Sequence, residues 1–209
     1  MVDDSLPATL AGRLKQPLRH WSAQAGFQPE LSFGRHRGPA EHDARAAAVM
    51  IALYPHGGNW HLPLIVRPKH MVDHAGQVSL PGGSVERGET PKQAALREYS
   101  EELGAPSEDV RVLGRLSELY LFASNFRIEP WVGVLAERPN WRPSRHEVER
   151  LLEVPLDHLL DANNSTTFER RHGPIAYCAP CVRFESEHIW GATSMVLAEL
   201  KAVIEGLPD

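Results

Sequence analysis

The sequence predicts an α/β fold with a mixed sheet and one helix added at the N-terminus. Apolar, strand-like runs at residues 46–54 and 60–66 flank a Pro-His-Gly-Gly-Asn turn, which indicates a β-hairpin. Residues 90–104 carry the start and stop signals of a short helix. Strand-like runs near 110–135 and a final helix at 191–205 complete the alternation of strands and helices.

The composition is that of a globular domain with a core of its own. The chain has 209 residues, of which 42% are hydrophobic and 23% charged, with a net charge of −5. This charge provides no basic field for nucleic acid. No apolar run reaches the length of a membrane span, and the acidic start Met-Val-Asp-Asp is not a secretory signal. We therefore expect a cytoplasmic protein without nucleic-acid or membrane partners.

Residues 1–45 are expected to extend a catalytic domain at residues 46–209. Leucines recur at intervals of four in residues 6–22, where Pro7 can start and Pro17 can end a helix. They predict an N-terminal helix that offers a homodimer contact or a lid. These leucines are Leu6, Leu10, Leu14 and Leu18. Residues 23–45 are rich in Gly, Pro, His and Arg and are expected to form a surface loop.

Beyond the hairpin, further strands and helices are expected. The strands are predicted at residues 110–116, 120–122, 129–135, 166–169, 175–178 and 182–184. An amphipathic segment after Pro143, with Pro155 inside it, predicts two short helices. Cys178 and Cys181 form a lone Cys-x-x-Cys pair, for which packing is favoured over zinc binding or redox chemistry.

Local signals define the helix at residues 90–104. Thr90 and Gln93 form a capping box, Pro91 suits the first helical position, and Gly104 tolerates the left-handed conformation past the end. An apolar stripe predicts the face that packs against the core. Its members are Ala95, Leu96, Tyr99 and Leu103.

Three acids share another side of this helix. Glu98 lies three residues before Glu101 and four before Glu102. The common interpretation of such a run is a solvated helix face. Here the like charges repel one another with no Lys or Arg in the following turn, and a Leu-Pro-Gly-Gly turn precedes them. A divalent metal ion would offset this repulsion, so the acids predict a metal site.

The segment from Gly83 to Gly104 resembles the box of the Nudix hydrolases, G-x5-E-x7-R-E-U-x-E-E-x-G-U, where U is a bulky aliphatic residue. All seven specified positions other than U match, while Tyr99 and Ala105 stand at the two U positions. The resemblance implies a Nudix-type α/β/α sandwich. It also implies metal-dependent hydrolysis of a diphosphate that is linked to another group, commonly a nucleoside.

By this resemblance, Mg²⁺ or Mn²⁺ is the cofactor. Its implied ligands are Glu98, Glu101 and Glu102, with the Gly83 carbonyl as a further ligand. These hard oxygen ligands suit Mg²⁺ and not zinc.

The resemblance also implies two supporting roles. Arg97 is expected to pair with Glu89 and to brace the loop on the helix. Glu147 is the candidate general base, because related proteins carry an acid in the corresponding late loop; the competing interpretation is an ordinary surface glutamate.

The sequence around the box resembles the coenzyme A diphosphatase subgroup at residues 62–83, 125–135, 148–161 and 189–193. This implies a small nucleotide substrate, CoA or an acyl-CoA, that is cleaved to 3′,5′-ADP and 4′-phosphopantetheine. Val72 and Leu80 depart from the Arg and Phe that are frequent in the subgroup. The expected substrate-contacting residues are Arg67, Lys69, His74 and Gln77.

Other functions remain open at this stage. ADP-ribose, NADH or a dinucleoside polyphosphate would fit the same chemistry. A non-catalytic nucleotide sensor is a further alternative, although its acids would usually be eroded. Trp190 is expected to anchor the last helix in the core, with stacking on the substrate as the second interpretation.

Overall fold

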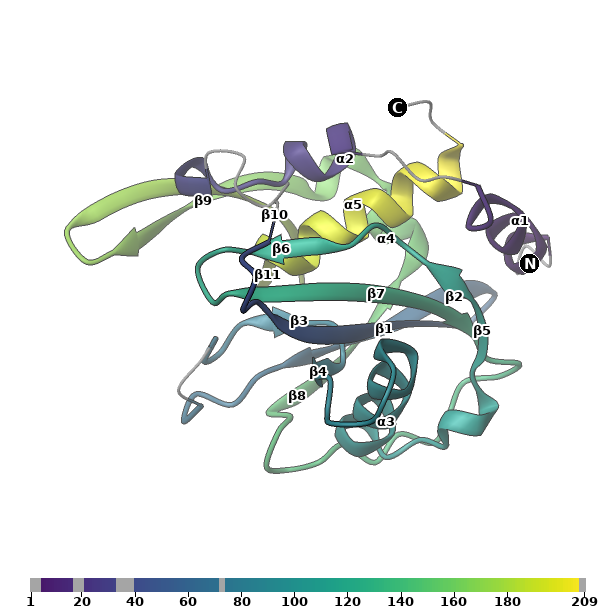
Figure 1. The fold of residues 1–209 in the computed structure, drawn as a ribbon. Helices are drawn as coiled ribbons and strands as arrows, with labels where there is room; N and C mark the ends of the chain where they lie inside the picture. The colour runs from purple at the N-terminus through teal and green to yellow at the C-terminus, as the bar shows by residue number, and fades with distance from the viewer. Residues whose placement is uncertain (1–4, 17–20, 33–39, 72–73, 207–209) are drawn as a thin grey trace.

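The computed structural model describes residues 5–16, 21–32, 40–71 and 74–206. A mixed β-sheet forms the middle layer of the molecule. Helix α3 (Pro91–Leu103) covers one face of this sheet, and helix α5 (Gly191–Glu205) covers the other (Figure 1). The predicted α/β architecture is confirmed, and both helices lie where their sequence signals place them.

Strand β1 (Arg45–His56) is the centre of the sheet. It pairs in parallel with β7 (Phe126–Val134) and antiparallel with both β2 (Asn59–Val66) and β4 (Gly82–Ser84). The β1–β2 hairpin predicted from the turn residues is confirmed. The parallel pair between β1 and β7 makes the sheet mixed.

Shorter strands complete this sheet. β3 (Val78–Ser79) pairs with β2, while β5 (Arg111–Arg115) and β6 (Leu119–Leu121) pair with β7. A 3-10 turn, η3 (Ser107–Asp109), connects α3 to β5. The strands expected near residues 110–116, 120–122 and 129–135 are therefore present.

The alternation of side chains along β1 divides the core in two. Ile51 and Leu53 face the α5 side, whereas Met50 and Tyr54 face the α3 side, and all four are fully buried. Because both faces of β1 are covered, its sequence is a nearly continuous apolar run. Within α3, Tyr99 and Leu103 are buried in the second cluster, and Leu96 is partly buried beside it.

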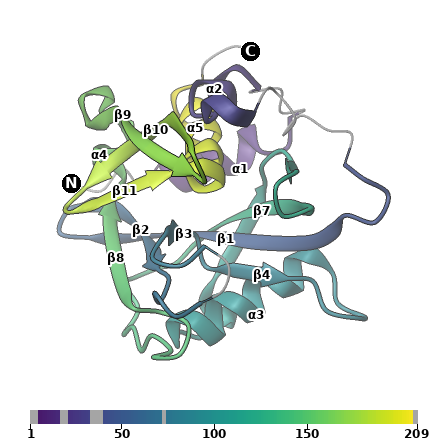
Figure 2. The same ribbon diagram turned by 90° about the vertical axis from the view of Figure 1, so that its left-hand side faces the viewer.

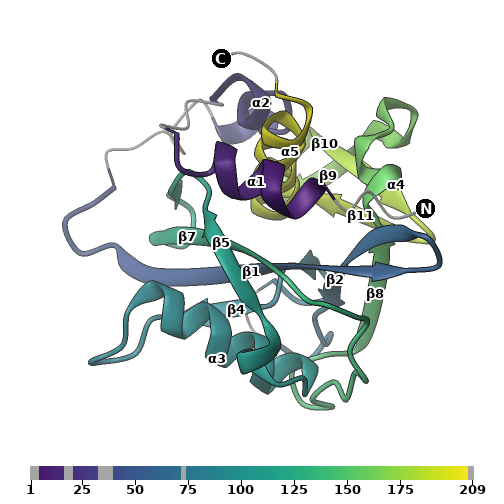
Figure 3. The ribbon, with the colours of Figure 1, turned by 90° about the vertical axis from the view of Figure 1, so that its right-hand side faces the viewer.

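The N-terminal segment packs on α5. Helix α1 (Leu6–Arg13) lies beside α5 and β5 (Figure 3), with Leu6 and Leu10 buried in the chain's own core. These two leucines therefore pack within the protein, and the homodimer contact or lid stays a prediction for the rest of the helix. Leu18 lies outside the described residues. Residues 23–45 were expected to be a loop, but they include most of α2 (Trp21–Gly26) and the 3-10 turn η1 (Glu30–Ser32).

The prediction of two short helices after Pro143 is half wrong. The first is strand β8 (Arg150–Pro155), which pairs antiparallel with β2, and only the second is a helix, α4 (Leu156–Leu160). Leu152 and Val154 alternate toward the core, and their pairing with a distant strand overrides the local helical spacing. The 3-10 turn η4 (Ala162–Asn164) follows α4.

The last strands form a separate three-stranded sheet. β10 (Ile175–Phe184) lies between β9 (Ser165–His172) and β11 (Glu187–Trp190), and the β9–β10 hairpin projects beyond the main sheet (Figures 1 and 2). β10 is one continuous strand where two were expected, and β11 was not predicted. Cys181 is buried as expected, whereas Cys178 is exposed.

Among the helices of the described residues, none combines the length and the apolar character that crossing a membrane requires.

Candidate active site

The helix that carries the acids is fixed at both ends by local contacts. The Thr90 hydroxyl accepts a hydrogen bond from the Gln93 N–H at 3.3 Å, and the Thr90 N–H donates to Gln93 Oε1 at 2.8 Å. Gly104 ends the helix with a left-handed φ of 62°. The predicted capping box and the predicted stop are both confirmed.

Arg97 connects the loop before this helix to the acids on it. Its guanidinium donates to both oxygens of Glu89, at 3.2 Å from Nε and 2.8 Å from Nη2. Nη1 lies 2.9 Å from Glu98 Oε1 and 2.9 Å from Glu101 Oε2, and Nη2 also donates to the Ser84 carbonyl at 3.1 Å. The expected ion pair between Arg97 and Glu89 is present. The guanidinium lowers the pKa of Glu89 and thereby keeps it charged.

Two of the three helix acids are withdrawn from solvent. Glu102 is 4% exposed, and its Oε2 accepts a hydrogen bond from the Gly82 N–H at 2.9 Å. Burial raises the pKa of Glu102 to about 8. The charges of Glu98 and Glu147 add to this rise, whereas the Gly82 N–H and the positive charge of Arg67 oppose it. Burial also raises the pKa of Glu98.

Glu147 belongs to the same electrostatic neighbourhood, although its side chain is exposed. Its negative charge raises the pKa of both Glu98 and Glu102. The Ser144 N–H donates to the Glu102 carbonyl at 2.9 Å, and the Glu147 N–H donates to the Ser144 carbonyl at 3.2 Å. The turn that carries Glu147 is therefore fastened to the C-terminal end of α3.

The two glycines of the Leu-Pro-Gly-Gly turn lie directly against the acids. A Cβ built on Gly83 would stand 2.2 Å from Glu98 Oε1, so no larger residue fits without moving that carboxylate. A Cβ on Gly82 would stand 2.4 Å from the Ala48 carbonyl oxygen. The turn thus allows β4 to approach both β1 and α3.

The loop between β2 and β3 carries the four residues predicted to contact substrate. The Arg67 N–H donates to the Gln77 carbonyl at 3.0 Å, and the Gly76 N–H donates to the Arg67 carbonyl at 3.0 Å, which closes the loop. His74 Nδ1 lies 3.2 Å from Gln77 Oε1, and His74 has a left-handed φ of 58°. Lys69 and His74 are exposed.

Within this set, the positive charge of Arg67 acts on the acids, because it lowers the pKa of Glu102. Its Nε is buried and has no hydrogen-bond partner. Leu80 is 4% exposed and packs in the core, and Val72 lies outside the described residues.

The acids suit a hard cation by their chemistry. Carboxylate oxygens and a glycine backbone lie close together, and burial disfavours the charged form of Glu98 and Glu102 unless a positive charge joins them. In the parts of the chain that the structure describes, no three His, Cys, Asp or Glu side chains form a ready-made ligand cluster. Glu98 and Glu101 instead share Arg97 Nη1, and Glu102 bonds to Gly82.

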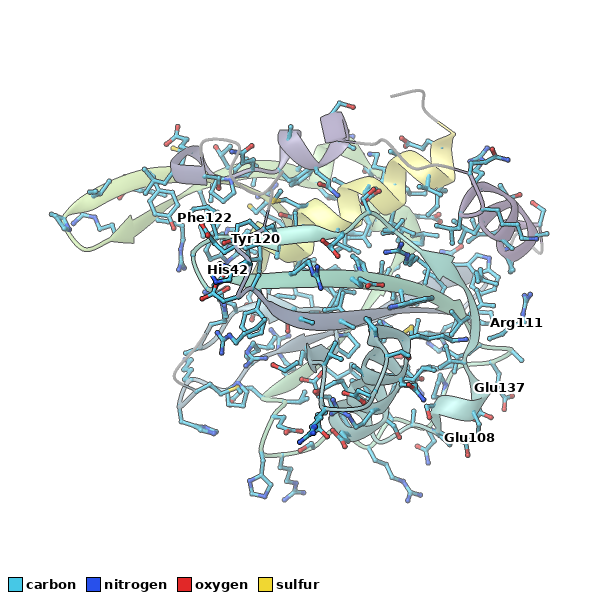
Figure 4. All side chains as sticks on the ribbon, viewed as in Figure 1. His42, Glu108, Arg111, Tyr120, Phe122 and Glu137 are labelled. Carbon is cyan, nitrogen blue, oxygen red and sulfur yellow. The ribbon has the colours of Figure 1, made fainter. Side chains whose placement is uncertain are left out.

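A cavity of about 670 Å³ lies beside the end of α3 and the segment after β7. Gly104, Asp109, Glu137 and Arg142 are among its lining residues. Figure 4 shows Glu137 on the same side of the molecule as Glu108 and Arg111. None of the predicted catalytic, metal-binding or substrate-binding residues lines this cavity, so the carboxylates and not the cavity mark the candidate site.

Sequence reasoning missed the backbone partners of the acids. The Gly82 N–H and the Ser84 carbonyl both bond to predicted site residues. The Leu-Pro-Gly-Gly turn was the available signal, because two adjacent glycines indicate a close approach of the backbone. The anchoring of the Glu147 turn to Glu102 left no signal in the sequence.

Comparison with known proteins shows the family to which the chain belongs. The NUDIX domain family matches residues 44–174. A protein of Pectobacterium atrosepticum, described as the uncharacterized Nudix hydrolase NudL, is 29% identical over 171 residues, covering 80% of this chain and 86% of its own length. Nudix hydrolase 3 of Caenorhabditis elegans is 31% identical over 189 residues, covering 81% of this chain and 77% of its own.

A solved structure shows a related fold. The Nudix hydrolase RenU of M. smegmatis has a TM-score of 0.56 at 21% identity, covering 79% of this chain and 89% of its own. The extent of the family match and the identity to the curated relatives establish the assignment. This chain belongs to the Nudix family and is a Nudix hydrolase.

Proposed function

We propose that this Nudix hydrolase cleaves the diphosphate of coenzyme A or an acyl-CoA into 3′,5′-ADP and 4′-phosphopantetheine, with Mg²⁺ or Mn²⁺ as cofactor. The supporting observation is that Glu98 and Glu102 lie against the Gly82–Gly83 turn, and that the charges of Glu147 and Arg67 act on these acids. Acids crowded in this way attract a cation, and a nearby arginine suits a phosphate group.

The residues of the candidate site are proposed to have different roles in metal binding and in the orientation of the acids. Glu98, Glu101 and Glu102 would hold the metal, and the Gly83 carbonyl is suited to join them. When bound, the metal neutralises charge on the phosphate oxygens and lowers the pKa of water. Arg97 holds Glu89, Glu98 and Glu101 in a single network, which orients the acids before substrate binds.

Arg67 is proposed to orient the diphosphate. Its positive charge acts on Glu102, and a guanidinium group suits a phosphate oxygen. His74 and Gln77 shape the same loop, and Lys69 adds positive charge on its surface. Glu147 is proposed to accept the proton of the attacking water, because it lies near Glu98 and Glu102 yet remains exposed. The water oxygen bonds to phosphorus while a bridging P–O bond breaks.

The preference for CoA rests on the resemblance of the flanking segments. The departure at Leu80 does not weaken it, because this side chain is 4% exposed and packs in the core. A leucine in place of phenylalanine there alters packing and not contact with a substrate.

The decisive experiment is a substrate panel. Purified protein is incubated with CoA, oxidised CoA, ADP-ribose and NADH, each with Mg²⁺ or Mn²⁺, and the phosphate-containing products are separated. We expect 3′,5′-ADP to be released from CoA with the highest kcat/KM. Glu102→Gln is expected to abolish this release. Faster turnover of ADP-ribose or NADH than of CoA would reassign the substrate, since the same acids serve any diphosphate.

A further inference from the structure

The three-stranded sheet has two faces of different charge. Directly paired residues share a face, so Arg170, Tyr177 and Phe168 lie on the same side as Arg183, His188 and Trp190. We call this side the cationic face. None of the described side chains on it is Asp or Glu. A surface of this kind attracts anions in a protein whose net charge is −5.

On the opposite face the charged residues form two ion pairs, one within the face and one with Arg150 of β8. Arg171 lies 3.7 Å from Glu169, and Glu187 lies 2.5 Å from Arg150. On the cationic face, neither Arg170 nor Arg183 makes an ion pair with any residue that the structure describes. The two faces of one strand therefore differ in whether their arginines are neutralised.

Arg170 is held on aromatic rings instead. Its guanidinium carbon lies 4.4 Å from the centre of the Trp190 ring and 5.9 Å from that of Phe168. Phe168 stacks on His188 with ring centres 4.5 Å apart and planes 8° apart. Arg170 Nε is buried without a hydrogen-bond partner. The rings hold this planar cation in place, and a guanidinium group can stack on a base and attract an anion.

The cationic face is connected to the candidate active site through β3. The Thr193 hydroxyl, three residues after Trp190, donates to the Val78 carbonyl at 3.1 Å, and β11 lies beside β3 (Figure 2). The chain from Val78 to Gly82, whose N–H bonds to Glu102, spans at most roughly 13 Å when extended. The start of α5 beside β11 and the carboxylates on α3 therefore contact the two ends of one short segment.

We propose that the cationic face binds the nucleotide portion of the substrate, with its planar base against the aromatic residues and a phosphate at Arg170. This inference rests on the proposed function and deepens it, because it assigns a binding subsite outside the carboxylate cluster. Trp190 then contributes to substrate binding as well as to the start of α5, which was the second interpretation of this residue from the sequence.

The test compares two adjacent arginines that lie on opposite faces of β9. Arg170→Gln and Arg171→Gln remove the same charge, but only the first alters the cationic face. We expect Arg170→Gln to raise the KM for CoA and to weaken the binding of 3′,5′-ADP, each by about ten-fold or more, with kcat unchanged. Arg171→Gln is expected to stay within about two-fold of the wild type. Arg170→Lys, which keeps the charge but loses the planar group, should give an intermediate affinity.

Calorimetric titration with 3′,5′-ADP separates this inference from the proposed function, because it requires no turnover. If the wild type binds 3′,5′-ADP but releases none from CoA, the proposed reaction is refuted. The affinities of the wild type and of Arg170→Gln for 3′,5′-ADP still test the cationic face in that case. Equal affinities of the wild type and Arg170→Gln would overturn the inference. Equal losses in both glutamine variants, or no binding by the wild type, would overturn it too. Thermal unfolding of each variant shows that the fold is intact.

Discussion

Arg97 holds Glu89 by two hydrogen bonds, of 2.8 and 3.2 Å, across eight residues of sequence. Glu89 lies in the loop before α3, and Arg97 lies on the helix. The same guanidinium reaches Glu98 and Glu101. Loop and helix acids are therefore oriented by one side chain, whose planar group supplies several donors in fixed directions.

Replacement of Arg97 by lysine is expected to lower kcat by about ten-fold or more. A lysine ammonium cannot make the paired contact to Glu89 and still reach Glu98 and Glu101, and a hydrogen bond to a charged group contributes about 1.5–3 kcal/mol. Steady-state kinetics on the preferred substrate provides the measurement. Arg87→Lys, in the exposed part of the same loop, is the matched control and should behave as the wild type. Equal activity of both variants would exclude an orienting role for Arg97.

Alanine at Gly83 is expected to impair activity more than stability. Its Cβ would meet the end of the flexible Glu98 side chain, which can turn away at small energetic cost but then leaves its position in the cluster. We expect kcat to fall by more than about ten-fold while the free energy of unfolding changes by less than about 1 kcal/mol. Kinetics and urea unfolding of the same preparation test both parts.

Gly104→Ala is the contrasting variant, because it is expected to lower the free energy of unfolding through strain in the backbone. Gly104 has a φ of 62°, and an added Cβ would lie 2.2 Å from the Arg142 carbonyl oxygen. The left-handed conformation alone costs roughly 1–2 kcal/mol for an alanine, and the backbone contact adds to this. The free energy of unfolding should therefore fall by at least that amount. A Gly83→Ala variant that is as destabilised as Gly104→Ala would contradict the assignment of Gly83 to the site.

Features with local causes were predictable from the sequence. Helix α3 is defined by Thr90, Gln93 and Gly104, which act within a few residues, so its bounds and its cap were correct. β8 has a non-local cause. Val148, Leu151 and Leu152 have the spacing of a helix face, but the two leucines pair with Ile65 and Leu64 of β2 and form a strand.

The same distinction applies to the candidate site. The resemblance to the Nudix box implied the contact of Arg97 with Glu89, and the structure shows this contact. The bond from Ser144 to the Glu102 carbonyl joins segments 42 positions apart, and Arg170 meets Trp190 only because β9 and β11 both flank β10. Neither relationship follows from periodicity or spacing, since each depends on which strands and turns become neighbours after folding.

Glu147→Gln is expected to reduce kcat by about 100-fold or more at neutral pH, with a small change in KM. Glutamine keeps the size of the side chain but cannot accept a proton from water, and general-base catalysis contributes typically 10²–10⁴-fold. The control is Glu149→Gln, an exposed acid two residues further along. Stopped assays of product release with both variants provide the measurement. If the two variants retain the same kcat, the general base is another group.

A last prediction concerns acid stability and the contacts of Glu153. Tyr54 and Trp141 donate to Glu153 Oε2 at 2.7 and 3.0 Å, and Arg138 donates to both oxygens at 2.6 and 2.7 Å. Burial alone would raise the pKa of this carboxyl. The hydrogen bonds outweigh burial and lower the pKa from 4.5 to about 2. Because the folded-state pKa lies below the unfolded one, the charged form stabilises the fold above about pH 4.5, and this contribution is lost as the pH falls toward 2.

Urea unfolding of the wild type and of Glu153→Gln between pH 2 and pH 7 tests this prediction. At neutral pH the variant should be less stable by about 2 kcal/mol, the contribution of hydrogen bonds to a charged group. This difference in the free energy of unfolding should shrink steadily below about pH 4.5. Only the wild type has a carboxylate at position 153, and that carboxylate becomes protonated as the pH falls. A difference that stays constant down to pH 2 would show that packing around Tyr54, and not the ionised carboxylate, accounts for the stabilisation.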